Sequence, residues 1–200
     1  MTANDIFEVS ISYNEYRSIT VANIEAYKNG DRSMRNVEKM DTVILNHSRM
    51  NRIEKHYQPN SALREAIAAI DTPQTWIVIS EDWCGDSAQI VPYLNAIASL
   101  NDNILFGIVI RDMYPDVMDL YLTDGTRGIP KLIAFGKDGA ELFTYGPRPA
   151  PGAALVAERK AQGISKDQFL EELQRWYNTD KGMSLEQEIL QRIQQVTIPV

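Results

Sequence analysis

The sequence predicts an α/β fold in which a mixed central sheet lies between helices. Gln74 to Ser80 and Ile104 to Ile110 are short apolar runs, as expected for strands that are covered on both faces. Residues 131–135 and 140–145 are two further strand-like runs on either side of Lys137-Asp138-Gly139, which predicts an antiparallel hairpin. Alternating strands and helices that end in a hairpin give a mixed sheet with helices on its faces.

Residues 1–60 are predicted to form an N-terminal helical extension. Apolar residues recur at helical spacing from Ile19 and stop at Asn29-Gly30, and a second helical run extends from Ser33 to about Tyr57. The second run carries an apolar stripe made of Met34, Val37, Met40, Ile44, Leu45 and Met50. We expect the extension to pack on the rest of the chain or on a second subunit, which would give a homodimer through the added helices.

A domain that contains the strands is predicted over residues 61–178. Its first helix begins at Ser61, whose side chain is expected to cap it. Its second helix runs from Ala88 to Leu100 and should bend at Pro92, because proline removes a helix hydrogen bond. A short third helix spans Pro115 to Leu122, with its proline in the first turn.

The last part of the chain is predicted to be helical. An alanine-rich helix at Ala153 to Gln162 lies in an insertion of about residues 147–163. A helix that is capped by Ser165 follows and ends at Tyr177. Residues 179–200 are then predicted to form a C-terminal helical extension.

Composition limits the classes of partner and location. The 200 residues carry a net charge of −7, which disfavours nucleic acid and anionic membrane surfaces as partners. No apolar run approaches the length of a membrane span, and the acidic N-terminus lacks the features of a signal peptide. The single cysteine excludes an internal disulfide, so we expect the cytoplasm, where a free thiol stays reduced.

That cysteine, Cys84, stands where a buried strand turns into a helix. Unpaired backbone N–H groups and the helix dipole favour a negative charge at such a position, which lowers the pKa of a thiol. Its neighbours Asp82, Asp86 and Ser87 are polar, which favours a reactive thiol. The alternative is a small buried apolar residue without reactivity.

The segment Trp83-Cys84-Gly85-Asp86-Ser87 resembles the thioredoxin motif Trp-Cys-Gly-Pro-Cys, with Asp86 in place of the proline and Ser87 in place of the second cysteine. Pro92 stands where thioredoxins carry the proline of this helix, and Arg127-Gly128-Ile129-Pro130 resembles the segment of the thioredoxin cis-proline. The resemblance covers roughly residues 71–177, whose last helix looks like the final thioredoxin helix. It implies a thioredoxin-like fold with added N-terminal and C-terminal helices.

The resemblance implies a thiol–disulfide oxidoreductase in which Cys84 is the nucleophile. Because the hydroxyl of Ser87 cannot resolve a mixed disulfide, turnover requires an external thiol such as glutathione or another small thiol. The expected substrates are protein or small-molecule disulfides, and no bound cofactor or metal is expected. Ser87 can also donate a hydrogen bond to the thiolate, or it is an ordinary first-turn helix residue.

Two further positions modify this expectation. Asp86 stabilises the first helical turn, but its carboxylate should also raise the pKa of the nearby thiol. The buried aspartate that thioredoxins carry six residues before the cysteine is replaced by Val78. This replacement makes dithiol activity of the thioredoxin kind doubtful.

The expected substrate-binding residues are Trp83, Gly85, Asp86, Ile129 and Pro130. If the Pro130 bond is cis, as in the family, the backbone of Ile129 lies beside Cys84 and can pair with a bound chain. A trans proline is the commoner alternative for such bonds.

Two basic residues near these positions leave alternatives open. Lys131 either supplies positive charge near the thiolate or points to solvent. Arg148 either reaches the rim of the site or lies in a surface linker.

Two other functions are considered. The missing second cysteine favours a non-catalytic protein-binding module that uses the cis-proline groove. A monothiol glutaredoxin-like iron–sulfur protein would need a dimer and glutathione to complete four thiolate ligands. His47 and His56 lie on the predicted N-terminal helices without a metal-binding partner, so ordinary surface or interface positions are expected for them.

Overall fold

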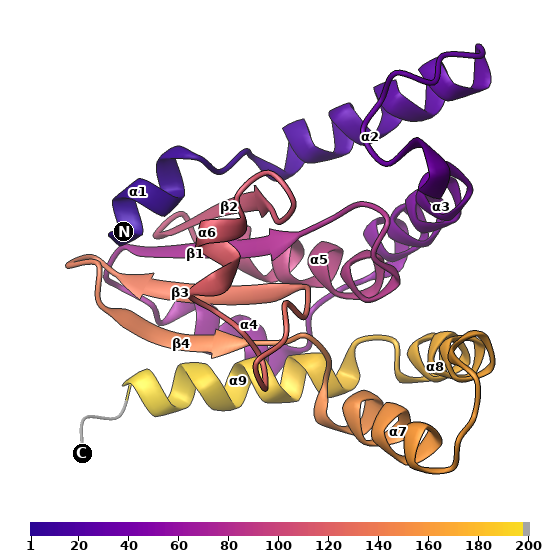
Figure 1. Ribbon diagram of the computed structural model, residues 1–200. Coiled ribbons are helices and arrows are strands. Elements are labelled where there is room, and N and C mark those ends of the chain that lie inside the picture. Colours follow the sequence, from indigo (N-terminus) through magenta and orange to yellow (C-terminus); the bar gives the residue numbers. More distant parts are fainter. Residues whose placement is uncertain (198–200) are drawn as a thin grey trace.

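A computed structural model, which describes residues 1–197, contains a four-stranded mixed sheet (Figure 1). The strands β1 (Gln74–Ser80), β2 (Ile104–Ile110), β3 (Lys131–Gly136) and β4 (Glu141–Tyr145) lie in the order β2-β1-β3-β4. β2 is parallel to β1, β3 is antiparallel to β1, and β4 is antiparallel to β3. The predicted thioredoxin-like arrangement of a mixed sheet between helices is confirmed.

The helices are α1 (Ala3–Glu8), α2 (Tyr13–Lys28), α3 (Met40–His56), α4 (Ser61–Ala68), α5 (Gly85–Ala98), α6 (Pro115–Asp119), α7 (Ala150–Ala161), α8 (Lys166–Asp180) and α9 (Met183–Thr197), with a 3-10 turn η1 (Val37–Lys39). None of the helices in the described part of the chain is both long enough and apolar enough to cross a membrane.

The central strand β1 separates two hydrophobic cores. Trp76 and Val78 point into the larger core, which residues of α4, α5, α8 and α9 complete. Ile77 and Ile79 point to the opposite face, where they contact side chains of α1 and α6. Because successive strand side chains alternate between faces, an unbroken apolar strand supplies both cores.

The N-terminal extension packs on the same chain, which is the first of the two arrangements expected from the sequence. Ile6 of α1 lies in the core beneath α6, and Ile11 forms an isolated antiparallel bridge with Ile108 of β2. Gly107 allows this close approach, because an added Cβ would lie 2.4 Å from Ser10 Oγ. α3 then contacts α5, the helix that follows Cys84.

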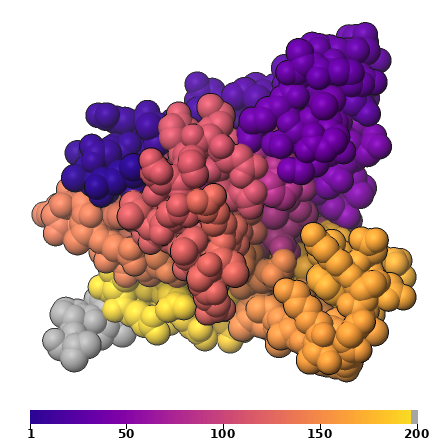
Figure 2. Space-filling model, viewed as in Figure 1, coloured from indigo at the N-terminus to yellow at the C-terminus, as the bar shows by residue number. Residues whose placement is uncertain are grey.

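The C-terminal helices form two groups. α7 and α8 pack on each other and form the orange lobe of Figure 2 beside the purple N-terminal segment. α9 runs along β4 and contacts α4 (Figure 1). The segment that was matched to the final thioredoxin helix is thus α8, whereas the helix that lies along the sheet is α9. Residues 198–200 of the predicted C-terminal extension lie outside the described residues.

Several helix boundaries differ from expectation for local reasons. Asn60, not Ser61, caps α4, since its side-chain oxygen accepts from Leu63 N at 2.9 Å. Ser165 occupies the N-cap position of α8, but its side chain makes no capping hydrogen bond. α5 begins directly after Cys84, three residues earlier than predicted.

Candidate functional site

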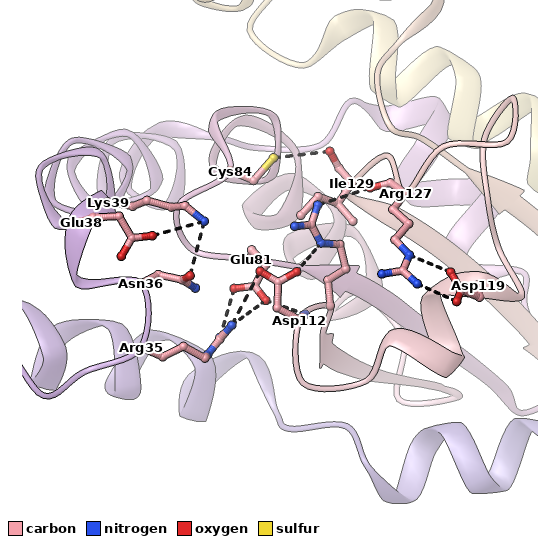
Figure 3. Close-up of polar contacts among 11 residues, drawn as sticks. Arg35, Asn36, Glu38, Lys39, Glu81, Cys84, Asp112, Asp119, Arg127 and Ile129 are labelled. Carbon is pink, nitrogen blue, oxygen red and sulfur yellow. Dashed lines mark hydrogen bonds and ion pairs between the residues drawn. The ribbon is translucent and has the colours of Figure 1, made fainter.

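Cys84 is the N-cap residue of α5, and its thiol faces the loop before β3 (Figure 3). The sulfur donates a hydrogen bond to the backbone carbonyl of Ile129 at 3.4 Å. The peptide bond between Ile129 and Pro130 is cis. The structure therefore has the cis bond and the close approach of Ile129 that the resemblance implied.

A surface hollow of about 680 Å³ opens beside the sulfur. Its lining includes Trp83, Cys84, Gly85, Asp86 and Ile129, which are residues that the sequence placed in a common site. Side chains of α3 and α8 form two of its walls. Cys84 is half-buried, so these helices flank the thiol without sealing it.

Ser87 and Pro130 lie behind this lining. Ser87 is only 1% exposed, and Pro130 is buried. The Ser87 hydroxyl has no hydrogen-bond partner of good geometry, but it lies close enough to the sulfur to lower the pKa of the thiol. It can therefore act on the sulfur but cannot itself touch a bound substrate.

The Cys84 thiol has a pKa above its ordinary value. Burial of the sulfur is the largest cause, and the carboxylate of Asp86 is the second. The nearby Ser87 hydroxyl and the backbone N–H groups at the start of α5 lower the pKa of the thiol, but they do not compensate these two effects. The expected effect of Asp86 has the predicted sign, whereas the net lowering expected from the helix terminus is wrong, because desolvation outweighs it.

Asp86 is buried and holds together three elements. Its Oδ2 lies 2.5 Å from Arg148 Nη2, and its Oδ1 accepts from the hydroxyl of Tyr177 at 2.8 Å. Burial raises the pKa of Asp86, although both partners lower it. Of the two alternatives for Arg148, the structure has the one in which it reaches the rim of the site.

The loop that carries Arg148 depends on a glycine. Gly146 has φ +106° and precedes a second cis proline, Pro147. An added Cβ at this position would lie 2.2 Å from the carbonyl oxygen of Pro130. The backbone of this loop is therefore in direct contact with the cis-proline segment.

Trp83 lies between two cations. The ammonium of Lys39 is 4.0 Å from the centre of its ring, and the guanidinium of Arg111 is 4.8 Å from it. With its amide oxygen turned toward them, Asn36 accepts from Trp83 Nε1 and from Arg35 Nη1, each at 3.2 Å. These contacts hold the indole of Trp83, one of the expected substrate-binding residues, against the N-terminal extension.

The buried carboxylate of Glu81, directly after β1, joins Arg35 and Asp112 (Figure 3). Glu81 is fully buried and accepts two hydrogen bonds from Arg35, at 3.0 and 3.1 Å. It also accepts from the backbone N–H of Asp112 at 2.8 Å. Glu81 thus links the N-terminal extension to the end of β2 beside the site.

The lining of the hollow is rich in cations. It contains Arg49, Arg111, Arg127, Arg148 and Lys166. Arg111, Arg127 and Arg148 each pair with an aspartate. Arg49 instead donates to the side chain of Asn46 at 2.8 Å. Asp86 and Glu171 also line the hollow, so Arg49 and Lys166 are the lining cations that are best placed to attract an anion, on a chain whose overall charge is −7.

Lys131 lies outside the lining of this hollow, and neither alternative from the sequence describes it. It is 9% exposed and donates to Thr123 Oγ1 at 3.3 Å. Burial lowers the pKa of its ammonium.

The histidines are placed on α3. His47 contacts Arg17 and Asn51, and His56 lines a separate hollow at the end of α3. Within residues 1–197, no three His, Cys, Asp or Glu side chains are grouped closely enough to hold a metal ion.

Sequence reasoning missed Arg35, Asn36, Arg49, Arg111 and Tyr177. They come from segments far from Cys84 in the chain, and nothing in their local patterns distinguishes them from ordinary surface or helix residues. The proline-rich sequence around Arg148 was the one usable signal, because prolines restrict the positions of the side chain between them.

Comparisons with known proteins agree with this fold. A family model described as thioredoxin matches residues 33–162. A crystal structure of a protein of unknown function from Pseudomonas aeruginosa is similar, with 16% identity, a TM-score of 0.64, and coverage of 98% of this chain and 99% of that one. The crystal structure of an HIV epitope-scaffold is also similar, with 16% identity, a TM-score of 0.61 and the same coverage. No curated protein matches. Because the family model spans more than half of the chain, the protein belongs to the thioredoxin family.

Proposed function

We propose that the protein is a monothiol thiol–disulfide oxidoreductase in which Cys84 is the nucleophile. The proposal depends on one observation: the sulfur of Cys84, a half-buried residue that lines a hollow open to solvent, faces the Ile129 carbonyl before a cis proline. A substrate chain that pairs with the backbone of Ile129 would bring its disulfide to the sulfur.

The proposed reaction consists of two thiol–disulfide exchange steps. The Cys84 thiolate attacks one sulfur of a substrate disulfide, the S–S bond breaks, and the other substrate sulfur leaves as a thiolate that takes up a proton. An external thiolate then attacks the substrate sulfur of this mixed disulfide. It forms a new disulfide with that sulfur and releases the Cys84 thiolate. Ser87 has no sulfur and cannot carry out the second step.

The raised pKa of the Cys84 thiol determines the pH range in which disulfide exchange is fast. Because the pKa of the Cys84 thiol is raised, the thiolate fraction at neutral pH is small. Each thiolate that forms is a stronger nucleophile, since nucleophilicity rises with pKa. Exchange should therefore accelerate as the pH rises above neutral.

The cationic rim supports an anionic small thiol as the second reactant. Arg49 and Lys166 line the hollow and are placed to attract a carboxylate-bearing thiol such as glutathione. A reducing compartment such as the cytoplasm supplies such thiols, and the single cysteine suits that setting.

The proposal is tested by incubating the protein with glutathione disulfide and measuring its mass. We expect one glutathionyl group on Cys84, removal of that group by added glutathione, and no adduct on Cys84→Ser. A wild-type protein that stays unmodified at every pH up to the highest at which it remains folded would rule the proposal out.

A protein-binding module is the second candidate, and the raised thiol pKa favours it. A mostly protonated sulfur that donates to Ile129 contributes to structure rather than chemistry. In that case Cys84→Ser should bind a protein partner with unchanged affinity. A dependence of binding on the thiol, reversed by a reductant, would instead favour the oxidoreductase.

A further inference from the structure

The N-terminal extension contributes a cation, Arg49 of α3, to the lining of the thiol hollow. Arg49 lies beside the residue that follows the nucleophile, because a Cβ added to Gly85 would lie 3.8 Å from Arg49 Nη1. The guanidinium therefore stands at the first turn of α5, one residue after Cys84 in the chain. A substrate whose disulfide reaches the sulfur would pass within reach of this side chain.

A buried asparagine fixes the position of Arg49. Asn46, one helical turn earlier on α3, is 1% exposed and donates from Nδ2 to the backbone carbonyl of Asp82 at 2.8 Å. Its Oδ1 accepts from Arg49 Nη1, also at 2.8 Å. The amide thus connects the guanidinium to the loop that precedes Cys84. Arg49 is held in place before a substrate arrives, which reduces the entropy that binding must otherwise remove.

The charge of Arg49 has no carboxylate partner among the described residues. Burial lowers the pKa of its guanidinium, and the neighbouring Arg52 lowers it further, with no acidic group in opposition. The two carboxylates that line the hollow are already paired, Asp86 with Arg148 and Glu171 with an arginine one turn further along α8. An anion in the hollow would therefore supply Arg49 with a countercharge that the chain itself does not provide.

The cleft between α3 and α8 has the size of a site for a small molecule. One face of each helix lines it, and the next turns of the two helices meet where Arg52 Nη2 donates to Asn178 Oδ1 at 2.7 Å. Gln174, which also lines the hollow, accepts from Gln89 of α5 at 2.9 Å. These contacts close the cleft at this end. Its volume of about 680 Å³ lies in the range of small-ligand sites, about 300 to 1,000 Å³.

We propose that Arg49 selects the substrate of the exchange reaction, a small disulfide that carries a carboxylate close to its sulfurs. This inference rests on the proposed function, because it names the substrate class of the same thiol. Arg49 would donate to the carboxylate while the disulfide lies against Cys84, whereas a cationic disulfide would meet an unpaired like charge. Lys166, exposed on the opposite wall, adds positive charge without a fixed contact.

The test compares two small disulfides of similar length and opposite charge. Dithiodipropionate carries carboxylates and cystamine carries ammonium groups. Each rate of Cys84 modification is divided by the rate of the same disulfide with free mercaptoethanol, at the same pH and ionic strength, which corrects for intrinsic reactivity. We expect the wild type to prefer dithiodipropionate about tenfold or more, because a charge-assisted hydrogen bond is made only with the carboxylate.

Variants of one helix separate selection from folding. Arg49→Gln should lose most of the preference, and Arg49→Lys should retain part of it, because lysine keeps the charge without the forked donors. Lys55→Gln removes an exposed cation of α3 that does not line the hollow, and it should keep the preference of the wild type.

An unreactive analogue tests recognition without exchange chemistry. Thiodipropionate, the thioether of the same acid, is titrated into Cys84→Ser while the amide NMR signal of Gly85 is followed. We expect saturable binding, which an added Arg49→Gln substitution should weaken about tenfold.

The outcomes distinguish this inference from the proposed function. Equal corrected rates for the two disulfides, or a preference that persists in Arg49→Gln, would overturn the inference and leave the reactive thiol in place. If no disulfide modifies Cys84 but thiodipropionate binds through Arg49, the carboxylate site stands and the oxidoreductase does not. Absence of both modification and binding would refute both.

Discussion

Replacing Asp86 by asparagine should make the Cys84 thiol more acidic. The carboxylate of Asp86 is the second-largest cause of the raised thiol pKa, after burial. Asparagine keeps the shape of the side chain, and its amide oxygen can still accept from the Tyr177 hydroxyl that now lies 2.8 Å from Asp86. Arg148 stays beside the site, and its positive charge is no longer neutralised by an ion pair.

The magnitude follows from Coulomb's law. Two unit charges roughly 6 Å apart, at an effective dielectric constant of about 20, interact by about 3 kcal/mol, which is about 2 pKa units. Because Arg148 already offsets part of the Asp86 charge, we expect the thiol pKa to fall by about 1 to 2 units. Nucleophilicity falls with the pKa, so the alkylation rate at neutral pH should rise only about 3-fold to 12-fold.

The assay is the rate of iodoacetamide alkylation of Cys84 between pH 6 and 11, followed by mass spectrometry. The midpoint of the rate profile gives the thiol pKa, and its plateau gives the nucleophilicity of the thiolate. Asp116→Asn, which removes an exposed carboxylate from α6, is the matched control and should leave the profile unchanged. An Asp86→Asn profile that coincides with that of the wild type, or lies at higher pH, would refute the electrostatic reasoning.

Three other variants are expected to act through single contacts. Ser87→Ala removes a hydroxyl that lowers the thiol pKa, so the pKa should rise by about 1 unit and alkylation at pH 7 should slow about threefold. Glu81→Gln weakens the paired hydrogen bonds from Arg35, and urea denaturation should show a loss of about 1 to 3 kcal/mol in the free energy of unfolding. Gly146→Ala places a Cβ against the carbonyl of Pro130, and thermal denaturation should show a loss of about 3 kcal/mol or more.

Each stability variant has a matched control on the surface. Glu38→Gln breaks only an exposed ion pair and should change the free energy of unfolding by less than about 0.5 kcal/mol. Gly163→Ala also forces a residue with positive φ, but no atom lies within 4 Å of the added Cβ, so only about 1 to 2 kcal/mol should be lost. Equal losses at Gly146 and Gly163 would show that the contact with Pro130 is unimportant. A Ser87→Ala thiol that becomes more acidic would contradict the assigned role of the hydroxyl.

The sequence by itself determined the sheet and the position of the thiol. The strands at Gln74–Ser80 and Ile104–Ile110 are found where they were predicted, because an unbroken apolar run has few stable alternatives to a strand covered on both faces. The Trp-Cys-Gly segment and the Gly-Ile-Pro segment predicted that Cys84 and Ile129 would meet. The strands were predicted from local apolar patterns, whereas the meeting of Cys84 with Ile129, 45 positions away, was predicted from the resemblance to thioredoxin.

Only the tertiary structure decided the electrostatic state of the site. The thiol pKa depends on how much solvent the surrounding elements exclude, and this burial outweighs the helix terminus that the sequence displays. The pairing of Asp86 with Arg148 and Tyr177 joins residues 62 and 91 positions apart. Charge interactions and desolvation depend on distances across the fold, and neither composition nor periodicity contains those distances.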